Sequence, residues 1–386
     1  MSPVPVVWPA DVAGVVDELR AASADGRTVT IQGAGTKAAW GGPLSPVDLV
    51  LSLSRLSGVV AHEPGDRVVT VRAGTPLRSL QSFLAAAGQR LCVESGYADA
   101  TVGGVLASGE AGPLRTRYGS GRDLLIGVEF VRADAVVAHS GGRVVKNVAG
   151  YDLGRLLCGS YGTVGVLTQA TFRLHPLPAA STWVVAPRLG LASIPDLAGV
   201  VPTAVEYDWP GSASVGSLAV LIEGSAGGVA ARTQALQSLL RRASGSAEVE
   251  VEVGPEPPAW WGRYPFDDGE IGLKVASPAS LVPALVGALR DRFGDRVAVR
   301  GSLASGVLYA GLPSTVDAAV VAAGLDHARV LLAGTGGSCV VVAAPPSLKD
   351  GLDLWGEVPG LPLMRRLKGQ FDPSGRFAAG RFVGGL

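Results

Sequence analysis

The sequence predicts an α+β protein with two domains and a C-terminal tail, and three observations lead to this prediction. Short β-branched strands such as residues 28–32 end directly at glycine-rich loops. After two prolines, Pro176 and Pro178, alternating strands are interleaved with single helices, which is typical of α+β folds. The chain has 386 residues, enough for more than one independently packed core.

The N-terminal part begins with an amphipathic helix over residues 9–23, whose apolar positions recur at helical spacing. Short strands are expected next at residues 28–32, 48–53 and 68–74. A second helix should follow, because Thr75 is placed to cap it and Pro76 suits its first position. Gly88 is expected to end this helix.

From Gly103 to Gly165 the chain is rich in glycine, yet its sequence still predicts strands. The grouped polar residues in the stretch "RVVKNVAGYD" argue against a simple core element there, and a short helix is expected within residues 149–160, with Leu153, Leu156 and Leu157 on its apolar face. The expected strands are residues 124–133, 135–141 and 143–147.

The second domain shows five strand-like segments and three helical ones, which suggests split βαβ units packed on one face of a sheet. A helix and an ordered extension follow, and no sequence repeat is apparent. The strands are predicted at residues 217–224, 248–254, 269–277, 306–312 and 338–346, and the helices at 227–243, 280–294 and 314–325.

The bulk composition excludes several classes of function. Lys plus Arg and Asp plus Glu both number 33, so no net positive charge points to nucleic acid or an acidic membrane. The three cysteines, Cys92, Cys158 and Cys339, are too scattered for an iron–sulfur or zinc site and favour a reduced, cytosolic setting. Neither a signal peptide nor a transmembrane helix is predicted.

Three glycine-rich stretches are candidates for cofactor binding. The loop "GAGTK", Gly33–Lys37, follows a strand, and its successive backbone N–H groups are suited to an anion such as a diphosphate. It lacks the third glycine of a dinucleotide-binding fingerprint. The stretches around "TVGG" at Thr101 and "CGSYGTVGV" at Cys158 can bring backbone close to a flat ligand, because glycine carries no side chain.

The order of these three stretches resembles the FAD-binding domain of the vanillyl-alcohol oxidase / p-cresol methylhydroxylase (PCMH-type) flavoproteins. Together with the tail "RRLKGQFDPSGRF", the sequence is most similar to the FAD-binding E-type subunits of glycolate oxidase (glycolate dehydrogenase). The resemblance implies a PCMH-type domain of two α+β subdomains at residues 1–178, a smaller α+β cap domain at 179–360, and a tail at 361–386 that returns to the first domain.

By this resemblance the three stretches and the tail would bind FAD. In the tail, Ala378 and Ala379 stand where relatives carry Asn-Pro before the basic residue. Leucine at Gly162 or Gly165 is expected to remove FAD before it unfolds the protein. The implied FAD-binding residues are Gly33, Ala34, Gly35, Thr36, Lys37, Thr101, Val102, Gly103, Gly104, Ser108, Gly109, Gly159, Gly162, Thr163, Gly165, Val166 and Arg381.

The resemblance further implies an FAD-dependent oxidoreductase subunit acting on a 2-hydroxy acid such as glycolate. Its partners would be a sister flavin subunit and an iron–sulfur subunit. Its location would be cytoplasmic, with peripheral attachment to the inner face of the membrane through partner subunits as one alternative. Two other readings stay open: a free-standing FAD oxidoreductase for an alcohol, sugar or hydroxy acid, and a non-catalytic flavin-binding scaffold.

Histidine usage refines the expected chemistry. No histidine stands beside the glycine loop, so FAD is expected to be bound non-covalently. Only His327 lies beyond residue 178, so the two-histidine metal site of hydroxy-acid-oxidising relatives cannot be built there, and no metal is expected. No catalytic residue is assigned. The aromatic stretch at Trp260 and Trp261, with Arg263, would either cover the flavin and orient a carboxylate or pack the second domain.

Overall fold

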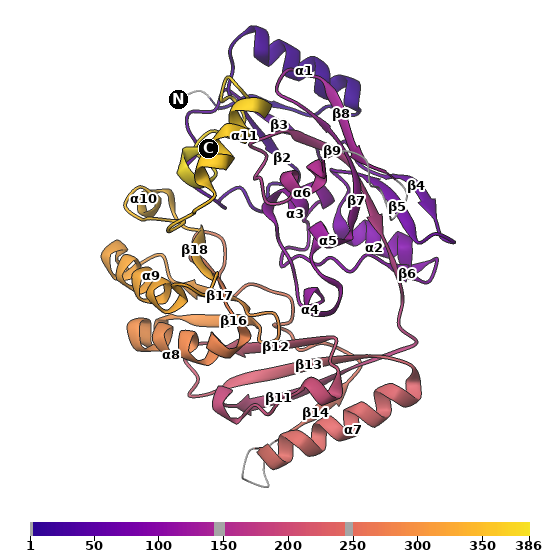
Figure 1. The fold of residues 1–386 in the computed structure, drawn as a ribbon, viewed down its shortest axis with the longest axis vertical. Coiled ribbons are helices and arrows are strands. Elements are labelled where there is room, and N and C mark those ends of the chain that lie inside the picture. Colours follow the sequence, from indigo (N-terminus) through magenta and orange to yellow (C-terminus); the bar gives the residue numbers. More distant parts are fainter. Residues whose placement is uncertain (1–2, 143–150, 244–249) are drawn as a thin grey trace. The chain divides into compact units, whose positions relative to one another are not determined.

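The computed structural model describes residues 3–142, 151–243 and 250–386, and it divides the chain into two compact units (Figure 1). The first unit contains residues 1–112, 118–177 and 357–386, so it includes the C-terminal segment of the chain. The second contains residues 113–117 and 178–356. The predicted strand at 143–147, with Lys146 and Asn147, lies outside the described residues.

The first unit begins with a small parallel sheet in the order β1-β3-β2. In the sequence, helix α1 lies between β1 and β2. Asp11 caps α1 by accepting a hydrogen bond from the Gly14 N–H, and Val15 and Leu19 are buried on its inner face. Strand β2 positions the glycine loop, because the loop starts at the residue after the strand ends. The bounds are β1 Val6–Val7, α1 Val12–Ala24, β2 Val29–Gln32 and β3 Leu49–Ser52.

The larger sheet of this unit has five antiparallel strands in the order β4-β5-β9-β7-β8. A short antiparallel pair, β6 with β10, lies apart from it. The strands are β4 Val59–Glu63, β5 Val68–Arg72, β6 Gln89–Arg90, β7 Leu125–Val131, β8 Val137–Gly141, β9 Val166–Arg173 and β10 His175–Pro176; the helices are α2 Leu77–Ala85, α3 Val102–Ser108, α5 Gly121–Leu124 and α6 Leu153–Leu157. Helix α4, Arg115–Tyr118, has its first three residues in the second unit.

Two local predictions in this unit are wrong. Thr75 does not cap α2, because its hydroxyl donates to the Arg72 carbonyl and accepts from the Gly58 N–H; the residue before the helix is Pro76. The "TVGG" stretch, where no helix was predicted, forms helix α3. Thr101 caps this helix through its hydroxyl, which accepts from the Gly104 N–H and offsets the low helix propensity of the two glycines.

The second unit is built on one eight-stranded sheet in which every pair is antiparallel. Helices α7, α8 and α9 pack through Leu236, Leu285 and Leu325 into a single core with the sheet. The elements are β11 Ala180–Leu189, η1 Leu191–Ser193, η2 Ala198–Val200, β12 Ala204–Trp209, β13 Gly216–Gly224, α7 Ala226–Ala243, β14 Glu252–Gly254, β15 Ile271–Ala276, η3 Ala279–Leu281, α8 Val282–Phe293, η4 Gly294–Arg296, β16 Ala298–Ser302, β17 Val307–Leu312, α9 Ala318–Leu332, β18 Ser338–Ala343 and α10 Pro346–Lys349.

The strand order of this sheet contains the same pattern twice. The order is β14-β11-β13-β12-β16-β17-β15-β18, so each half places its fourth, first, third and second strands side by side, and β12 joins β16 at the centre. This is the arrangement of a split βαβ unit, as the alternation of strands and helices predicts. The duplication is structural, since the sequence shows no repeat.

The C-terminal segment packs onto the first unit through α11 Leu361–Phe371 and the residues after it, which include η5 Val383–Gly385 (Figure 1). The Val29 N–H donates to the Arg376 carbonyl, and the Ala378 N–H donates to the Val29 carbonyl. The segment is therefore bonded directly to β2, the strand that leads into the glycine loop.

A buried lysine fixes this segment to the third glycine-rich stretch. Lys368 Nζ donates to Asp372 Oδ2 at 2.6 Å, to the Thr163 carbonyl at 2.7 Å and to the Phe377 carbonyl at 2.9 Å. Burial lowers the pKa of Lys368, an effect that Asp372 opposes. The position of residues 159–165 is thus coupled to the C-terminal helix.

Candidate functional site

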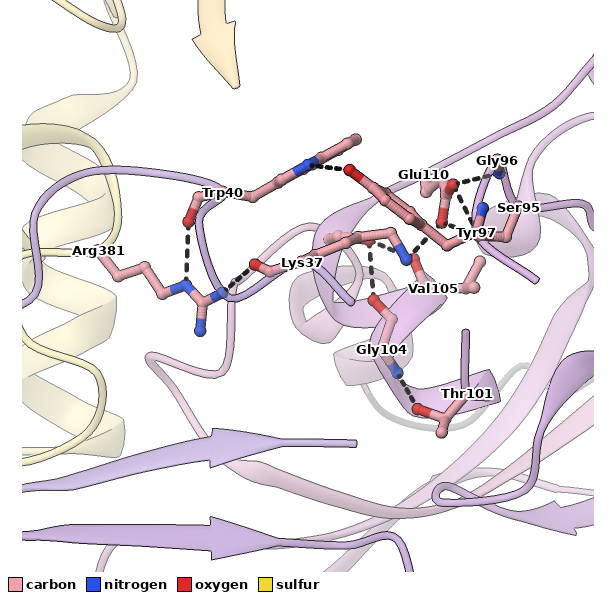
Figure 2. Close-up of polar contacts among 11 residues, drawn as sticks. Lys37, Trp40, Ser95, Gly96, Tyr97, Thr101, Gly104, Val105, Glu110 and Arg381 are labelled. Carbon is pink, nitrogen blue, oxygen red and sulfur yellow. Dashed lines mark hydrogen bonds and ion pairs between the residues drawn. The ribbon is translucent and has the colours of Figure 1, made fainter. Parts of the chain in front are cut away.

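A cleft in the first unit brings together the glycine loop, helix α3, the third glycine-rich stretch and Arg381. Figure 2 shows Lys37 of the loop, Thr101 and Gly104 at the start of α3, and Arg381. Its walls come from segments more than 300 residues apart in sequence, since Thr30 and Arg381 both line it. The lining residues are Thr30, Ile31, Gln32, Gly33, Ala34, Gly35, Thr36, Lys37, Ala38, Leu44, Leu53, Ala73, Thr101, Gly103, Gly104, Ala107, Ser108, Ser160, Tyr161, Gly162, Gly165, Leu167 and Arg381.

The glycine loop offers the cleft a row of backbone donors. Within the described part of the chain, the N–H groups of Ala34, Gly35, Thr36 and Lys37 donate to no acceptor, whereas Ala38 donates back to the Gly35 carbonyl. Gly35 has a φ of 78°, in the left-handed region that favours glycine. Successive N–H groups that line one cleft form a nest for an anion, so this loop fits the diphosphate of FAD.

The glycine loop approaches α3 more closely than any side chain would permit. A Cβ on Gly33 would overlap the Thr101 hydroxyl, which is the cap of α3. On the other side of α3, a Cβ on Gly103 would lie 2.8 Å from the Ala73 Cβ. These two glycines allow the loop, α3 and the end of β5 to pack tightly beside the cleft.

The third stretch turns sharply where it meets the cleft. Gly159 and Gly162 have φ values of 78° and 77°, and Tyr161 between them has a φ of 55°, which is uncommon for a residue with a side chain. Such backbone strain clusters at binding sites. Burial raises the pKa of Tyr161 to about 12, so its phenol stays neutral and able to donate a hydrogen bond at neutral pH.

Arg381 brings a buried positive charge to the cleft. Its Nη2 donates to the Lys37 carbonyl and its Nε to the Trp40 carbonyl, at 2.6 and 3.2 Å. Only 9% of the residue is exposed, and no ion pair joins it to a carboxylate in the described ranges. Burial lowers the pKa of this guanidinium, because its charge has left water and no carboxylate among the described residues compensates it. An anionic ligand would supply that compensation.

Lys37, by contrast, has its compensating charge nearby. Its Nζ lies 2.7 Å from Glu110 Oε2, and both side chains are more than nine-tenths buried. Glu110 also accepts hydrogen bonds from the Ser95 hydroxyl and the Gly96 N–H. In Figure 2 the Lys37 side chain extends toward Glu110 and Tyr97, whereas its carbonyl faces Arg381.

The cleft contains twelve of the residues predicted from the sequence, and five others lie elsewhere. The side chains of Val102 and Val166 are buried in the core, and Gly109 ends α3 with a φ of 62°. Gly159 and Thr163 line a second, mostly apolar cavity beside α11. FAD contacts by these five stay predictions. Those in the cleft are Gly33, Ala34, Gly35, Thr36, Lys37, Thr101, Gly103, Gly104, Ser108, Gly162, Gly165 and Arg381.

Sequence reasoning missed the apolar part of the cleft wall. Ile31, Leu53 and Leu167 line the cleft from the ends or edges of strands, where apolar residues are expected in any core. Tyr161 was the one missed residue with a usable signal, because a large aromatic between two glycines is unusual in a turn.

The structure separates the roles of Gly162 and Gly165. A Cβ on Gly162 would lie 3.7 Å from Ile31, a lining residue, so leucine there should enter the cleft. A Cβ on Gly165 would lie 3.0 Å from Phe130 Cδ2, so leucine there should overpack the core. The expectation that FAD is lost before the fold therefore stays a prediction for Gly162→Leu, whereas the packing around Gly165 predicts a loss of stability for Gly165→Leu.

We expect Gly162→Leu to weaken FAD binding at least about tenfold. Its free energy of unfolding should fall by only about 1–2 kcal/mol, the cost of a side chain on a residue in the left-handed conformation. Gly165→Leu should lose about 1–3 kcal/mol of folding free energy through overpacking. Urea unfolding of the apoprotein and FAD titration measure the two effects separately. Equal losses of affinity at unchanged stability in both variants would contradict this division.

The aromatic stretch of the second unit packs within that unit. Trp261 makes edge contacts with Trp183, with ring centres 6.0 Å apart, and Tyr264 stacks on Phe266 at 5.2 Å. Arg263 is exposed, and its carbonyl accepts from Arg300. These contacts account for the aromatic cluster as packing, and its predicted role over the flavin stays a prediction.

Two further searches of the described residues bear on function. None of their helices combines the length and the apolar character needed to span a bilayer. The same residues contain no group of three or more His, Cys, Asp or Glu side chains placed to hold a metal ion.

Comparison with known proteins identifies the cleft-bearing unit. Residues 3–141 match the family described as FAD binding domain. Glycolate oxidase subunit GlcE of Escherichia coli is 40% identical over 169 residues, which are 43% of this chain and 48% of that protein. A D-lactate dehydrogenase of Archaeoglobus fulgidus is 33% identical over 171 residues, covering 44% and 38%. The aligned segments thus span less than half the length of these relatives.

The fold extends this similarity to the whole chain. A solved alkyldihydroxyacetonephosphate synthase superposes with a TM-score of 0.69 at 16% identity, covering 97% of this chain and 76% of that one. At this identity the likeness concerns the fold alone. The family match and the donor-rich cleft agree on the cofactor, which is FAD. Residues 3–141 therefore match an FAD-binding domain, and the fold of the chain agrees with the PCMH-type fold that the sequence predicts.

Proposed function

We propose that the chain is the FAD-binding subunit of a multi-subunit oxidoreductase that oxidises a small 2-hydroxy acid, with glycolate as the first candidate. The observation that carries the proposal is the 40% identity to a glycolate oxidase subunit. Other relatives are named for D-lactate and D-2-hydroxyglutarate, which are also 2-hydroxy acids. The class of substrate is thus shared among relatives, whereas the individual acid differs.

The residues of the cleft suit a cofactor-binding role. The loop N–H groups from Ala34 to Lys37 would bind the diphosphate, and Arg381 would offset its negative charge. Ile31, Leu53 and Leu167 would exclude water from the apolar part of the ligand. When bound, FAD supplies hydride acceptance and onward electron transfer, chemistry that the side chains themselves lack. Among the described residues that line the cleft there is neither a histidine nor a cysteine, which supports non-covalent binding.

We further propose that the substrate is oxidised on a sister flavin subunit, with an iron–sulfur subunit as the next electron acceptor. The histidine inventory supports this assignment. His62 is bonded to Gln89, and His175 packs on Tyr118 in the first unit. His139 lies in β8, also in the first unit. His327 is the single histidine of the sequence beyond residue 178, so a histidine pair in the second unit cannot form.

The decisive experiment is affinity purification of the full chain from its native cells, with flavin and iron assayed in the recovered material. We expect FAD, two co-purifying chains and iron, with glycolate-dependent dye reduction by the complex and little by the isolated chain. Recovery of the chain alone, yellow and active, would favour the free-standing oxidoreductase. FAD with partners and no loss of glycolate oxidation when FAD binding is abolished would favour the scaffold.

A further inference from the structure

We propose that Glu110 is a positioning residue of the FAD site. In this reading the Lys37–Glu110 pair is an internal brace that sets the spacing between the two walls of the cleft. The inference rests on the proposed binding of FAD by this cleft. It assigns a role to Glu110, which lies outside the cleft lining, and it removes Lys37 from the cations that compensate the ligand's charge.

The Lys37–Glu110 pair joins the two walls of the cleft. Lys37 ends the glycine loop of one wall. Glu110 follows the last turn of α3, the other wall, and its N–H donates to the Val105 carbonyl at 3.2 Å. The 2.7 Å contact between Lys37 Nζ and Glu110 Oε2 therefore connects the loop to the helix directly.

Further contacts bind the same two walls through residues 95–97. The Ser95 hydroxyl donates to both oxygens of Glu110 at 2.8 Å, and the Gly96 N–H donates at 2.9 Å. Tyr97 accepts a hydrogen bond from the Trp40 indole, while Lys37 Nζ lies 5.3 Å from the centre of its ring (Figure 2). Glu110 thus receives three kinds of donor, which fixes its carboxylate in one place.

The burial of the Lys37–Glu110 pair favours a brace over a Lys37 side chain that binds phosphate. Exposed fractions of 8% for the Lys37 side chain and 1% for Glu110 mean that both charges have left water. A buried charge that loses its partner is strongly unfavourable, whereas a neutral pair of similar shape is often tolerated. Because Lys37 is committed to Glu110, the positive charge left for an anion is that of Arg381, which has no carboxylate partner among the described residues.

The test is a double-mutant cycle on FAD affinity of the apoprotein, using Glu110→Gln, Lys37→Met and the double variant. We expect each single change to weaken FAD binding at least about tenfold, because one buried charge is left without its partner. The double variant should bind FAD within about threefold of wild type, because both charges are gone and Gln keeps the hydrogen bonds from Ser95 and Gly96. The exposed pair Arg78–Asp99 supplies the control, and Asp99→Asn should change nothing measurable.

A phosphate-binding Lys37 makes the opposite prediction. Glu110→Gln would then leave FAD affinity equal or tighter, and the double variant would be as weak as Lys37→Met; either result overturns the brace. If a single variant fails to fold, as judged by circular dichroism, the FAD affinity of the double variant relative to wild type decides. An affinity within about threefold of wild type supports the brace, and a weaker affinity contradicts it. If wild-type apoprotein itself binds no FAD, the proposed function fails, and this outcome is distinct from failure of the brace.

Discussion

Arg381→Met should weaken FAD binding about 100-fold, the largest loss expected from removing any single side chain of the cleft. Hydrogen bonds to a charged group contribute about 1.5–3 kcal/mol, and the contacts of Arg381 with the loop are lost as well. The guanidinium is buried beside the cleft and holds the Lys37 and Trp40 carbonyls. Its removal takes away both the charge facing the ligand and a support of the glycine loop.

Arg381→Lys is the matched variant, because it keeps the charge but cannot donate to both carbonyls with one planar group. We expect it to bind FAD with an affinity between wild type and Arg381→Met, and to retain more of the salt dependence of binding. Titration of apoprotein with FAD at low and high salt measures both effects. Arg381→Met with wild-type affinity would show that the tail does not reach the ligand.

Gly33→Ala should weaken FAD binding strongly with the smallest possible change of side chain. The new Cβ would overlap the Thr101 hydroxyl, so either the loop or α3 must move. Because loop and helix are the two walls of the cleft, its shape changes in either case. We expect FAD affinity to fall at least about 100-fold. This loss combines the cost of overpacking, about 1–3 kcal/mol, with the loss of aligned N–H donors in the loop.

Two controls isolate this clash. Gly65→Ala adds the same methyl group where nothing lies within 4 Å, and it should leave both FAD affinity and stability unchanged. Gly33→Ala combined with Thr101→Ala removes the overlapping hydroxyl, at a cost of about 1 kcal/mol for the lost helix cap. The combination should regain part of the FAD affinity. A double variant no better than Gly33→Ala would contradict the steric explanation.

The sequence predicted the site best where backbone chemistry alone defines it. The loop from Gly33 to Lys37 follows a strand and carries two glycines, and the structure places all five of its residues in the cleft lining. The fold class followed from the alternation of strands and helices. Helix α3 was missed because Gly103 and Gly104 oppose helix formation, and the tight contact of Gly103 with Ala73 that requires glycine is not visible in one dimension.

Long-range pairs were beyond prediction for a physical reason. Glu110 lies 73 positions after Lys37, and nothing local distinguishes it from a surface carboxylate. Its burial follows from the turn at Gly109, which directs the chain back toward residues 95–97. Likewise, the doubled strand order of the second unit was not predicted, because the sequences of its two halves show no repeat.

The bonding of residues 376–378 to β2 has a consequence for biosynthesis. Val29 is made early, yet its hydrogen-bond partners Arg376 and Ala378 emerge from the ribosome almost 350 residues later. The second unit is complete in sequence by then and is free to fold first, while the nascent first unit still waits for its last strand contacts. Chains interrupted before residue 376 would lack these contacts and the Arg381 cation together. Flavin capture would thus mark those polypeptides whose translation reached the tail.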